Sequence, residues 1–252
     1  MHFTNIFNKD LKQAIDENFS NIDTENVGPF VYSIIKTIRP KKILEIGAGY
    51  TSIFFAKALQ EINEEDSFDN DLINKQSELQ EWKRRKKILN KNYNFNQKTK
   101  LIIIDNFSKV KYGAARSVDN TISKLKLDEF VDFVEGDGMN LQLIHNLIEK
   151  YLPLDFVFLD FGASAALPVL FKFYFQRINN FDGYIMVHST LTNAMHRLWL
   201  AELKLKYNND STVEIMSFLE PNKIIQNSFT LIKKNGEPES GQFYPPIYTA
   251  QP

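Results

Sequence analysis

Acidic side chains and one histidine stand directly after short apolar runs of this chain. They are Glu45, Asp105, Asp137, Asp160 and His188. In parallel α/β sheets, ligands bind beyond the carboxyl ends of the strands, at the point where the strand order reverses. Carboxylates at such an edge suit a ligand rich in hydroxyl, amino and ammonium donors, because ionised carboxyl groups only accept hydrogen bonds. A histidine beside them adds a group that exchanges a proton near neutral pH.

The first of these strand ends leads into a glycine turn. Gly47 and Gly49 have no Cβ, which lets the chain turn tightly and lets a ligand approach the backbone. Thr51 or Ser52 is placed to cap the helix that follows. A Rossmann dinucleotide site needs a third glycine where this chain has Ser52, so the pattern disfavours an NAD-dependent oxidoreductase.

An alternation of apolar strands and helices positions these residues. The hydrophobic periodicity predicts strands over residues 42–46, 101–104, 130–134, 155–159, 184–187, 212–218 and 228–233. It predicts helices over residues 10–19, 30–38, 51–59, 114–125, 141–151, 165–178 and 191–207. Strand–helix units in series require a mainly parallel sheet. The predicted fold class is α/β: a Rossmann-like, mainly parallel seven-stranded sheet with helices on both faces and an antiparallel C-terminal strand pair at its edge.

The chain of 252 residues is predicted to form a single domain, residues 1–252. Its N-terminal helices occupy residues 1–40, and an aromatic, proline-containing tail occupies residues 236–252. Residues 61–98 are polar, with acids first and bases after them, and they interrupt the alternation. We interpret this segment as an insertion that contains an amphipathic helix, because its large apolar residues fall on one helical face. These residues are Leu72, Leu79, Trp82 and Leu89.

Charge and composition disfavour several functional classes. Thirty basic and 31 acidic residues give a net charge of -1, so no general attraction to nucleic acid or to an anionic membrane is expected. The absence of cysteine excludes disulfides, thiolate metal sites and thiol nucleophiles. The first residues lack the pattern of a secretory signal, and no apolar run is long enough for a membrane span. The protein is therefore predicted to be cytoplasmic and not to bind membranes.

The run Ile43-Leu44-Glu45-Ile46-Gly47-Ala48-Gly49-Tyr50-Thr51-Ser52 resembles the first motif of class I S-adenosylmethionine-dependent methyltransferases. The preceding Gly28-Pro29 helix and the closing strands support the resemblance, which extends from about Val27 to Lys233 apart from the insertion. Three further strand ends also support it: Ile104-Asp105, Val134-Glu135-Gly136-Asp137 and Phe156-Val157-Phe158-Leu159-Asp160.

This resemblance implies a binding role for each part of the strand-end constellation. Gly47, Ala48 and Gly49 would lie along the methionine part of the cofactor, with Glu45 near its ammonium group. The carboxylate of Asp105 would accept hydrogen bonds from the ribose hydroxyls, although it comes later in the chain than such an acid usually does. The insertion accounts for that delay. Asp137 and Gly138 would border the adenine.

By the same resemblance, Asp160 and His188 face the place where the methyl group is transferred. In the catechol-type, metal-dependent subgroup the fourth strand ends in Asp and the fifth in Asp-Asn, whereas this chain has His188-Ser189 at the fifth end. No metal is predicted, because Mg²⁺ prefers oxygen ligands. Neutral His188 is instead predicted to take a proton from the acceptor as the methyl group is attacked.

The predicted function is methylation of a hydroxyl or amine of a small-molecule acceptor, with S-adenosylmethionine as the cofactor. Two alternatives stay open: aminopropyl or aminobutanoyl transfer from the same cofactor, and a catalytically silent methyltransferase fold that serves as a binding module. The even charge and the absence of an appended basic domain disfavour RNA methylation. Monomer and homodimer both stay open.

Overall fold

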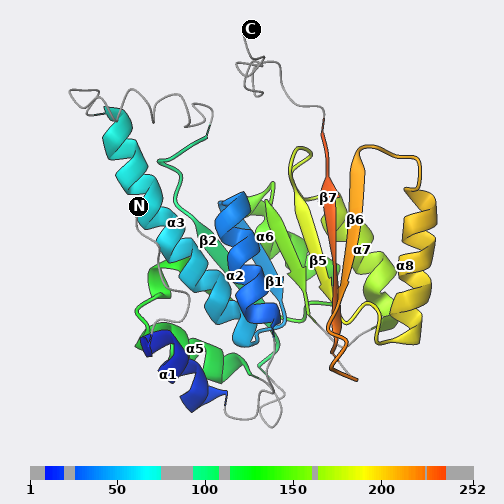
Figure 1. The fold of residues 1–252 in the computed structure, drawn as a ribbon, viewed down its shortest axis with the longest axis horizontal. Coiled ribbons are helices and arrows are strands. Elements are labelled where there is room, and N and C mark those ends of the chain that lie inside the picture. The colour runs from blue at the N-terminus through cyan, green and yellow to red at the C-terminus, as the bar shows by residue number, and fades with distance from the viewer. Residues whose placement is uncertain are drawn as a thin grey trace, which may run out of the picture.

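A seven-stranded sheet forms the centre of the protein (Figure 1). The computed structural model describes residues 9–19, 26–74, 93–107, 114–160, 164–224 and 226–236. The strands are β1 (Lys42–Ile46), β2 (Lys100–Asp105), β3 (Val131–Glu135), β4 (Phe156–Leu159), β5 (Tyr184–His188), β6 (Val213–Leu219) and β7 (Ser228–Lys234). Their order is β3-β2-β1-β4-β5-β7-β6; β1 to β5 are parallel, and β7 runs antiparallel to both β5 and β6. The predicted sheet is confirmed, with β6 on its edge.

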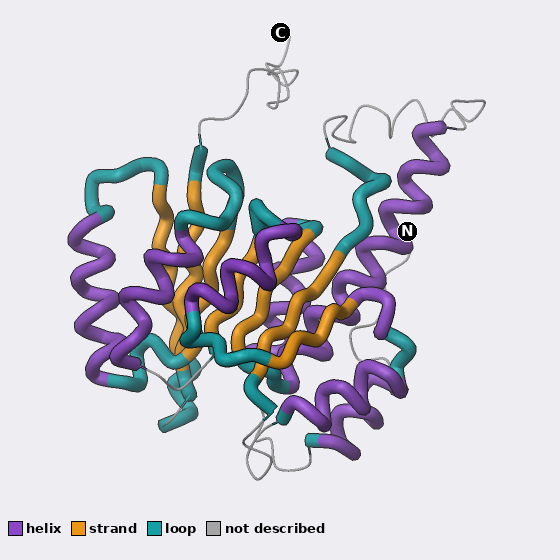
Figure 2. Tube along the Cα trace, turned by 180° about the vertical axis from the view of Figure 1, so that it is seen from behind, coloured by secondary structure: helices purple, strands orange, loops and turns teal. Residues whose placement is uncertain are grey.

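Helices cover both faces of the sheet (Figures 1 and 2). One layer contains α1 (Lys9–Asn18), α2 (Val27–Ile38), α3 (Tyr50–Asn74) and α5 (Ala115–Lys124), and the other contains α6 (Leu141–Ile148), α7 (Leu167–Phe175) and α8 (Ala194–Lys206). Short 3-10 helices span Asp128–Phe130, Glu149–Tyr151 and Ser164–Ala166. Side chains alternate between the layers along each strand, so Ile43 packs with the first and Leu44 with the second. Burial of both faces explains why the parallel strands are apolar runs.

Helix α2 begins at Val27, three residues before the predicted start at Phe30. Pro29 lies in its first turn, where the missing backbone N–H removes no intrahelical hydrogen bond. Gly28-Pro29 therefore forms part of the helix and does not precede it.

Helix α3 is much longer than its predicted range, which ended at Leu59, and continues to Asn74. Acidic residues of this polar stretch form ion pairs with basic residues near the end of α2. Arg39 Nη1 lies 2.8 Å from Asp66 Oδ1, and buried Lys41 also pairs with Asp66. The first part of the predicted insertion is thus a helix with a partly buried ionic face. The amphipathic segment predicted within 61–98 lies mostly outside the described residues.

The strand order reverses at the boundary between β1 and β4. The chain proceeds from β1 through β2 to β3 on one side, and β4 and β5 follow on the other side of β1. Open α/β sheets bind their ligands at this reversal, beyond the carboxyl ends of the strands. That edge lies at the bottom of Figure 1. Glu45, Asp105, Asp160 and His188 are all located there, at the ends of β1, β2, β4 and β5.

Candidate functional site

The glycine turn after β1 is held by its neighbouring strands. The backbone N–H of Gly47 donates to the Ile104 carbonyl at 2.9 Å, and the Asp160 N–H donates to the Ile46 carbonyl at 3.1 Å. Gly47 has a φ of 92°, and a Cβ there would lie 2.2 Å from the Asp160 carbonyl oxygen. Glycine at 47 is thus required by the backbone of β4, apart from any ligand. At Gly49 a Cβ would lie 3.6 Å from Thr51 Oγ1, an ordinary contact.

Helix α3 begins directly after this turn, and both predicted capping residues make contacts. Ser52 Oγ accepts from the Gly49 N–H at 3.1 Å, so this side chain reaches back from the first turn of the helix. Thr51 Oγ1 instead donates to Glu45 Oε1 at 2.8 Å. The start of α3 thereby fixes both the glycine turn and the carboxyl group beneath it.

Glu45 is a fully buried acid with 0% exposure. Its Oε2 atom has no hydrogen-bond partner among the residues that the structure describes. Burial raises the pKa of Glu45 to about 8, against hydrogen bonds from Ser52 and Thr51 that lower it; the nearby charges of Asp160 and Asp105 add to the rise. A buried acid with one oxygen unmatched is a candidate binding group for a cation.

Asp105 joins the end of β2 to the glycine turn. Its Oδ2 atom accepts a hydrogen bond from the Ala48 N–H at 2.8 Å, across a separation of 57 residues. The polar segment between β1 and β2 therefore does not displace Asp105 from the site. The structure brings Glu45, the glycine turn and Asp105 together; their predicted cofactor contacts stay predictions.

The turn after β3 also packs against this edge. A Cβ on Gly138 would lie 2.5 Å from Ile46 Cγ2, so the turn touches the end of β1. Asp137 Oδ1 accepts from the Met139 N–H at 2.9 Å, and the Asp137 carbonyl accepts from the Asn140 N–H. The carboxyl group of Asp137 is exposed and stabilises its own turn. Its predicted contact with adenine stays a prediction.

Asp160 and His188 form a pair at the ends of adjacent strands. His188 Nδ1 lies 2.8 Å from Asp160 Oδ1, and the two side chains are 6% and 36% exposed, with the histidine the more buried. Because Nδ1 faces a carboxylate, this geometry favours the tautomer that carries its proton on Nδ1. The acid thus orients the imidazole and can stabilise its protonated form.

His196, for which no role was predicted, lies beside this pair. It is buried on the first turn of α8, and its Nδ1 atom lies 3.2 Å from the carbonyl oxygen of Ser189. Ser189 follows His188 directly and has a positive φ of 57°. His196 therefore supports the turn that carries His188. No spacing in the sequence linked these two histidines.

The start of α2 borders the same edge. The Gly28 N–H donates to Tyr50 Oη at 2.7 Å, and a Cβ on Gly28 would lie 2.4 Å from Phe54 Cε2. Asn26 Nδ2 donates to Glu220 Oε1 at 2.7 Å, which ties α2 to the turn between β6 and β7. Sequence inspection did not identify Tyr50 or Glu220, because their partners are remote in the chain.

Within the described ranges, no three His, Asp or Glu side chains are grouped so that they could hold a metal ion. The two residues at the metal-binding strand ends of the catechol-type subgroup contact each other here. Their arrangement does not fit a Mg²⁺ site built on oxygen ligands. Among the described helices, none is long and apolar enough to cross a membrane. Location in the cytoplasm stays a prediction.

Comparison with known proteins shows which solved structures share this architecture. No protein-family model and no curated protein sequence matches the chain. Among solved structures, it is similar to an O-methyltransferase from Bacillus cereus in complex with S-adenosylhomocysteine, with 16% identity and a TM-score of 0.60 over 90% of this chain and 91% of that one. It is also similar to the O-methyltransferase TomG from Streptomyces achromogenes, involved in tomaymycin synthesis and in complex with S-adenosylmethionine. That match has 15% identity and a TM-score of 0.60 over 91% of each chain.

An rRNA methylase from Streptococcus thermophilus has the same fold. It matches with 10% identity and a TM-score of 0.51, over 85% of this chain and 100% of that one. These neighbours differ in the acceptor that their names imply, so the fold does not choose the acceptor. The chain has the class I methyltransferase fold, and its function must be inferred from its own site.

Proposed function

We propose that this chain is an S-adenosylmethionine-dependent methyltransferase that acts on a hydroxyl or amine of a small molecule. The observation that carries the proposal is the buried, half-bound carboxyl group of Glu45 beneath the glycine turn. Asp105 is bonded to the same turn, and the Asp160–His188 pair lies at the next two strand ends. The bound cofactor or product in two neighbours of the same fold supports this assignment.

The residues present fit this cofactor by their chemistry. We assign Glu45 Oε2, a buried oxygen without a partner among the described residues, to accept from the ammonium group of the methionine part. The open side of Gly49 would allow close approach of that part to the backbone. Asp105, anchored through Ala48, is the acceptor for the ribose hydroxyls. Asp137 and Gly138 lie on the turn proposed to border the adenine.

When bound, the cofactor supplies a methyl group on a sulfonium, which is already a good leaving group. The protein therefore has to align the acceptor and manage its proton. We assign the proton to His188 Nε2, because Nδ1 is engaged by Asp160. Asp160 stabilises the imidazolium that forms, as a carboxylate does in other acid–histidine pairs.

Calorimetric titration with S-adenosylmethionine, and separately with S-adenosylhomocysteine, tests the proposal. We expect both to bind with affinities on the order of micromolar, near the usual range for enzyme ligands. Hydroxyl and amino compounds would then be screened for a methylated product, which also separates methyl transfer from aminopropyl transfer. If neither ligand binds, the proposal fails; binding of NAD would then indicate an oxidoreductase, and its absence a silent binding module.

Gly49→Val tests whether the cofactor lies on the glycine turn. A side chain there meets ordinary packing distances, so the melting temperature should change little while affinity for S-adenosylmethionine falls by roughly tenfold or more through the lost close approach. Gly47→Val is the contrasting variant, because its Cβ collides with the Asp160 carbonyl and should lower the melting temperature. Unchanged affinity in folded Gly49→Val would place the ligand elsewhere.

Chelation tests the proposed metal independence. Since His188 and Asp160 engage each other, we expect turnover to be the same before and after exhaustive dialysis against EDTA, and added Mg²⁺ to leave it unchanged. Turnover that is lost on dialysis and regained with Mg²⁺ would contradict the assignment of His188 as the proton acceptor.

A further inference from the structure

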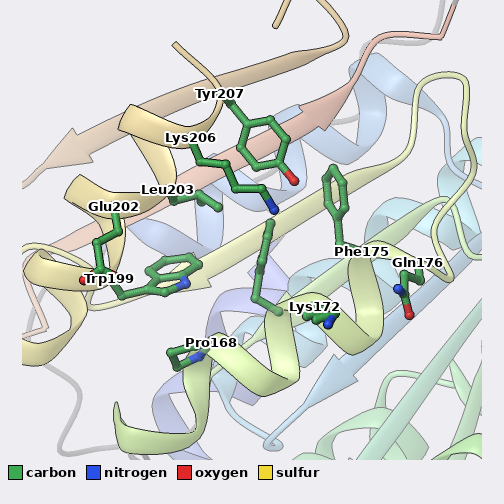
Figure 3. A pocket seen from close by; sticks show the side chains of 10 residues that line it. Pro168, Lys172, Phe175, Gln176, Trp199, Glu202, Leu203, Lys206 and Tyr207 are labelled. Atoms are coloured by element: carbon green, nitrogen blue, oxygen red, sulfur yellow. The ribbon is translucent and has the colours of Figure 1, made fainter.

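A groove with an aromatic lining lies between α7 and α8, on the sheet face opposite α2 and α3 (Figure 3). Its volume is about 390 Å³. Phe171 contacts Phe175 and Trp199, with ring centroids 5.1 and 5.4 Å apart, and Phe175 lies 5.9 Å from Tyr207. None of its lining residues belongs to the candidate methyl-transfer site. Lys172, Lys206 and Glu202 also line it, so the groove combines aromatic rings with a net positive charge.

The chain leaves the described structure beside this groove. Strand β7 ends at Lys234, whose Nζ atom lies 4.6 Å from the ring centroid of Phe175, a lining residue. The last described residue, Gly236, lies against Asn180 just beyond α7. Residues 237–252 therefore start at one end of the groove.

The sequence of this tail complements the groove. Its acids, Glu237 and Glu239, precede the aromatic and proline-rich segment Phe243-Tyr244-Pro245-Pro246-Ile247-Tyr248. The stretch from Gly236 to Phe243 can span up to roughly 23 Å. The groove extends along α7 from Pro168 to Phe175, which is about 10 Å of helix. The segment thus reaches the whole groove.

We propose that the groove between α7 and α8 is the docking site of the chain's own C-terminal segment, Phe243–Tyr248. Proline-rich segments bind aromatic-lined grooves because their extended conformation is preformed and loses little entropy. Tethering keeps the segment at a high effective concentration beside its site. Glu237 and Glu239 carry charge opposite to that of Lys172 and Lys206, which are two of the three charged residues of the lining.

The absence of cysteine in the chain allows a direct test by disulfide formation. One full-length variant carries Gln176→Cys, at the groove, together with Gln242→Cys, just before the docking segment. The matched control carries Glu214→Cys with Gln242→Cys. Glu214 Oε1 accepts from Asn235 Nδ2 at 2.5 Å, so residue 214 is also close to the start of the tail, but it does not line the groove.

We expect the intramolecular disulfide to form at least about tenfold faster in the groove pair than in the control pair, because docking raises the local concentration of one thiol at the other. Adding Tyr244→Ser, or Leu203→Lys in the groove, should remove this difference; the tail substitution leaves the folded core untouched. Equal rates in the two pairs would show that the tail does not dock there. A disulfide formed only between two chains would assign the groove to a second copy and overturn the proposal.

Discussion

Replacing His188 by alanine is expected to lower turnover roughly a hundredfold, the low end of the range for loss of a general base. The dissociation constant for S-adenosylmethionine should change by less than about twofold, because the predicted cofactor contacts lie on β1, β2 and β3. A loss confined to kcat is the sign of a group that acts in the transition state. Steady-state kinetics with the best acceptor and calorimetry on the same protein give the two numbers.

Asp160→Ala separates the two members of the pair. If His188 takes the proton, the alanine variant keeps an imidazole but loses its charged partner, so turnover should fall less than in His188→Ala. Asparagine is avoided because its amide can donate to Nδ1 and hold the imidazole in the wrong tautomer. Imidazole added to His188→Gly should restore part of the activity, since the small residue leaves room for it. A larger loss in Asp160→Ala, with no rescue of His188→Gly, would assign the proton to the partly exposed carboxylate.

The sheet could be predicted from the sequence because its strands are buried on both faces. Ile43 and Leu44 pack against different helical layers. A strand that is buried on both faces is a continuous apolar run, so its ends can be recognised in the sequence where polar residues begin. The order of strand and helix then limits the topology to a few arrangements. The seven strands and the antiparallel closing pair follow from these local patterns.

The length of α3 could not be predicted in the same way. Its second half is polar, and polar residues are typical of a loop or an insertion. Acids on that half pair instead with Arg39 and Lys41, which lie more than 20 residues earlier in the chain. A helix that is stabilised by ion pairs with residues remote in the chain cannot be recognised from its own residues alone.

The site was predictable as a set of strand ends, but not in its internal contacts. Parallel strands bring Glu45, Asp105, Asp160 and His188 to one edge whatever the details of packing. The contact that makes Gly47 indispensable comes from the backbone of Asp160, which carries no sequence information. Likewise, the complete burial of Glu45 depends on Thr51 and Ser52 folding over it at the start of α3.

Glu45→Gln is expected to make the ligand-free protein more stable at neutral pH. Because burial raises the pKa of Glu45 to about 8, the folded state holds the proton more tightly than the unfolded chain. The wild type should therefore lose stability as pH rises from the unfolded pKa of about 4.5 to 8, by roughly 3 kcal/mol between pH 4.5 and 7. Glutamine mimics the protonated acid, so the variant should lack this loss. Denaturant unfolding across this pH range measures the difference.

The same variant is expected to bind S-adenosylmethionine more weakly. An ammonium group beside Glu45 favours the ionised carboxylate, so binding at pH 7 should release up to about one proton, and the binding enthalpy should depend on the ionisation heat of the buffer. Glu45→Gln should remove this proton release. A purely structural acid would behave otherwise: its replacement would lower stability and leave the proton balance of binding unchanged. Greater stability with weaker binding is the pattern of a group retained for its ligand at a cost to the fold.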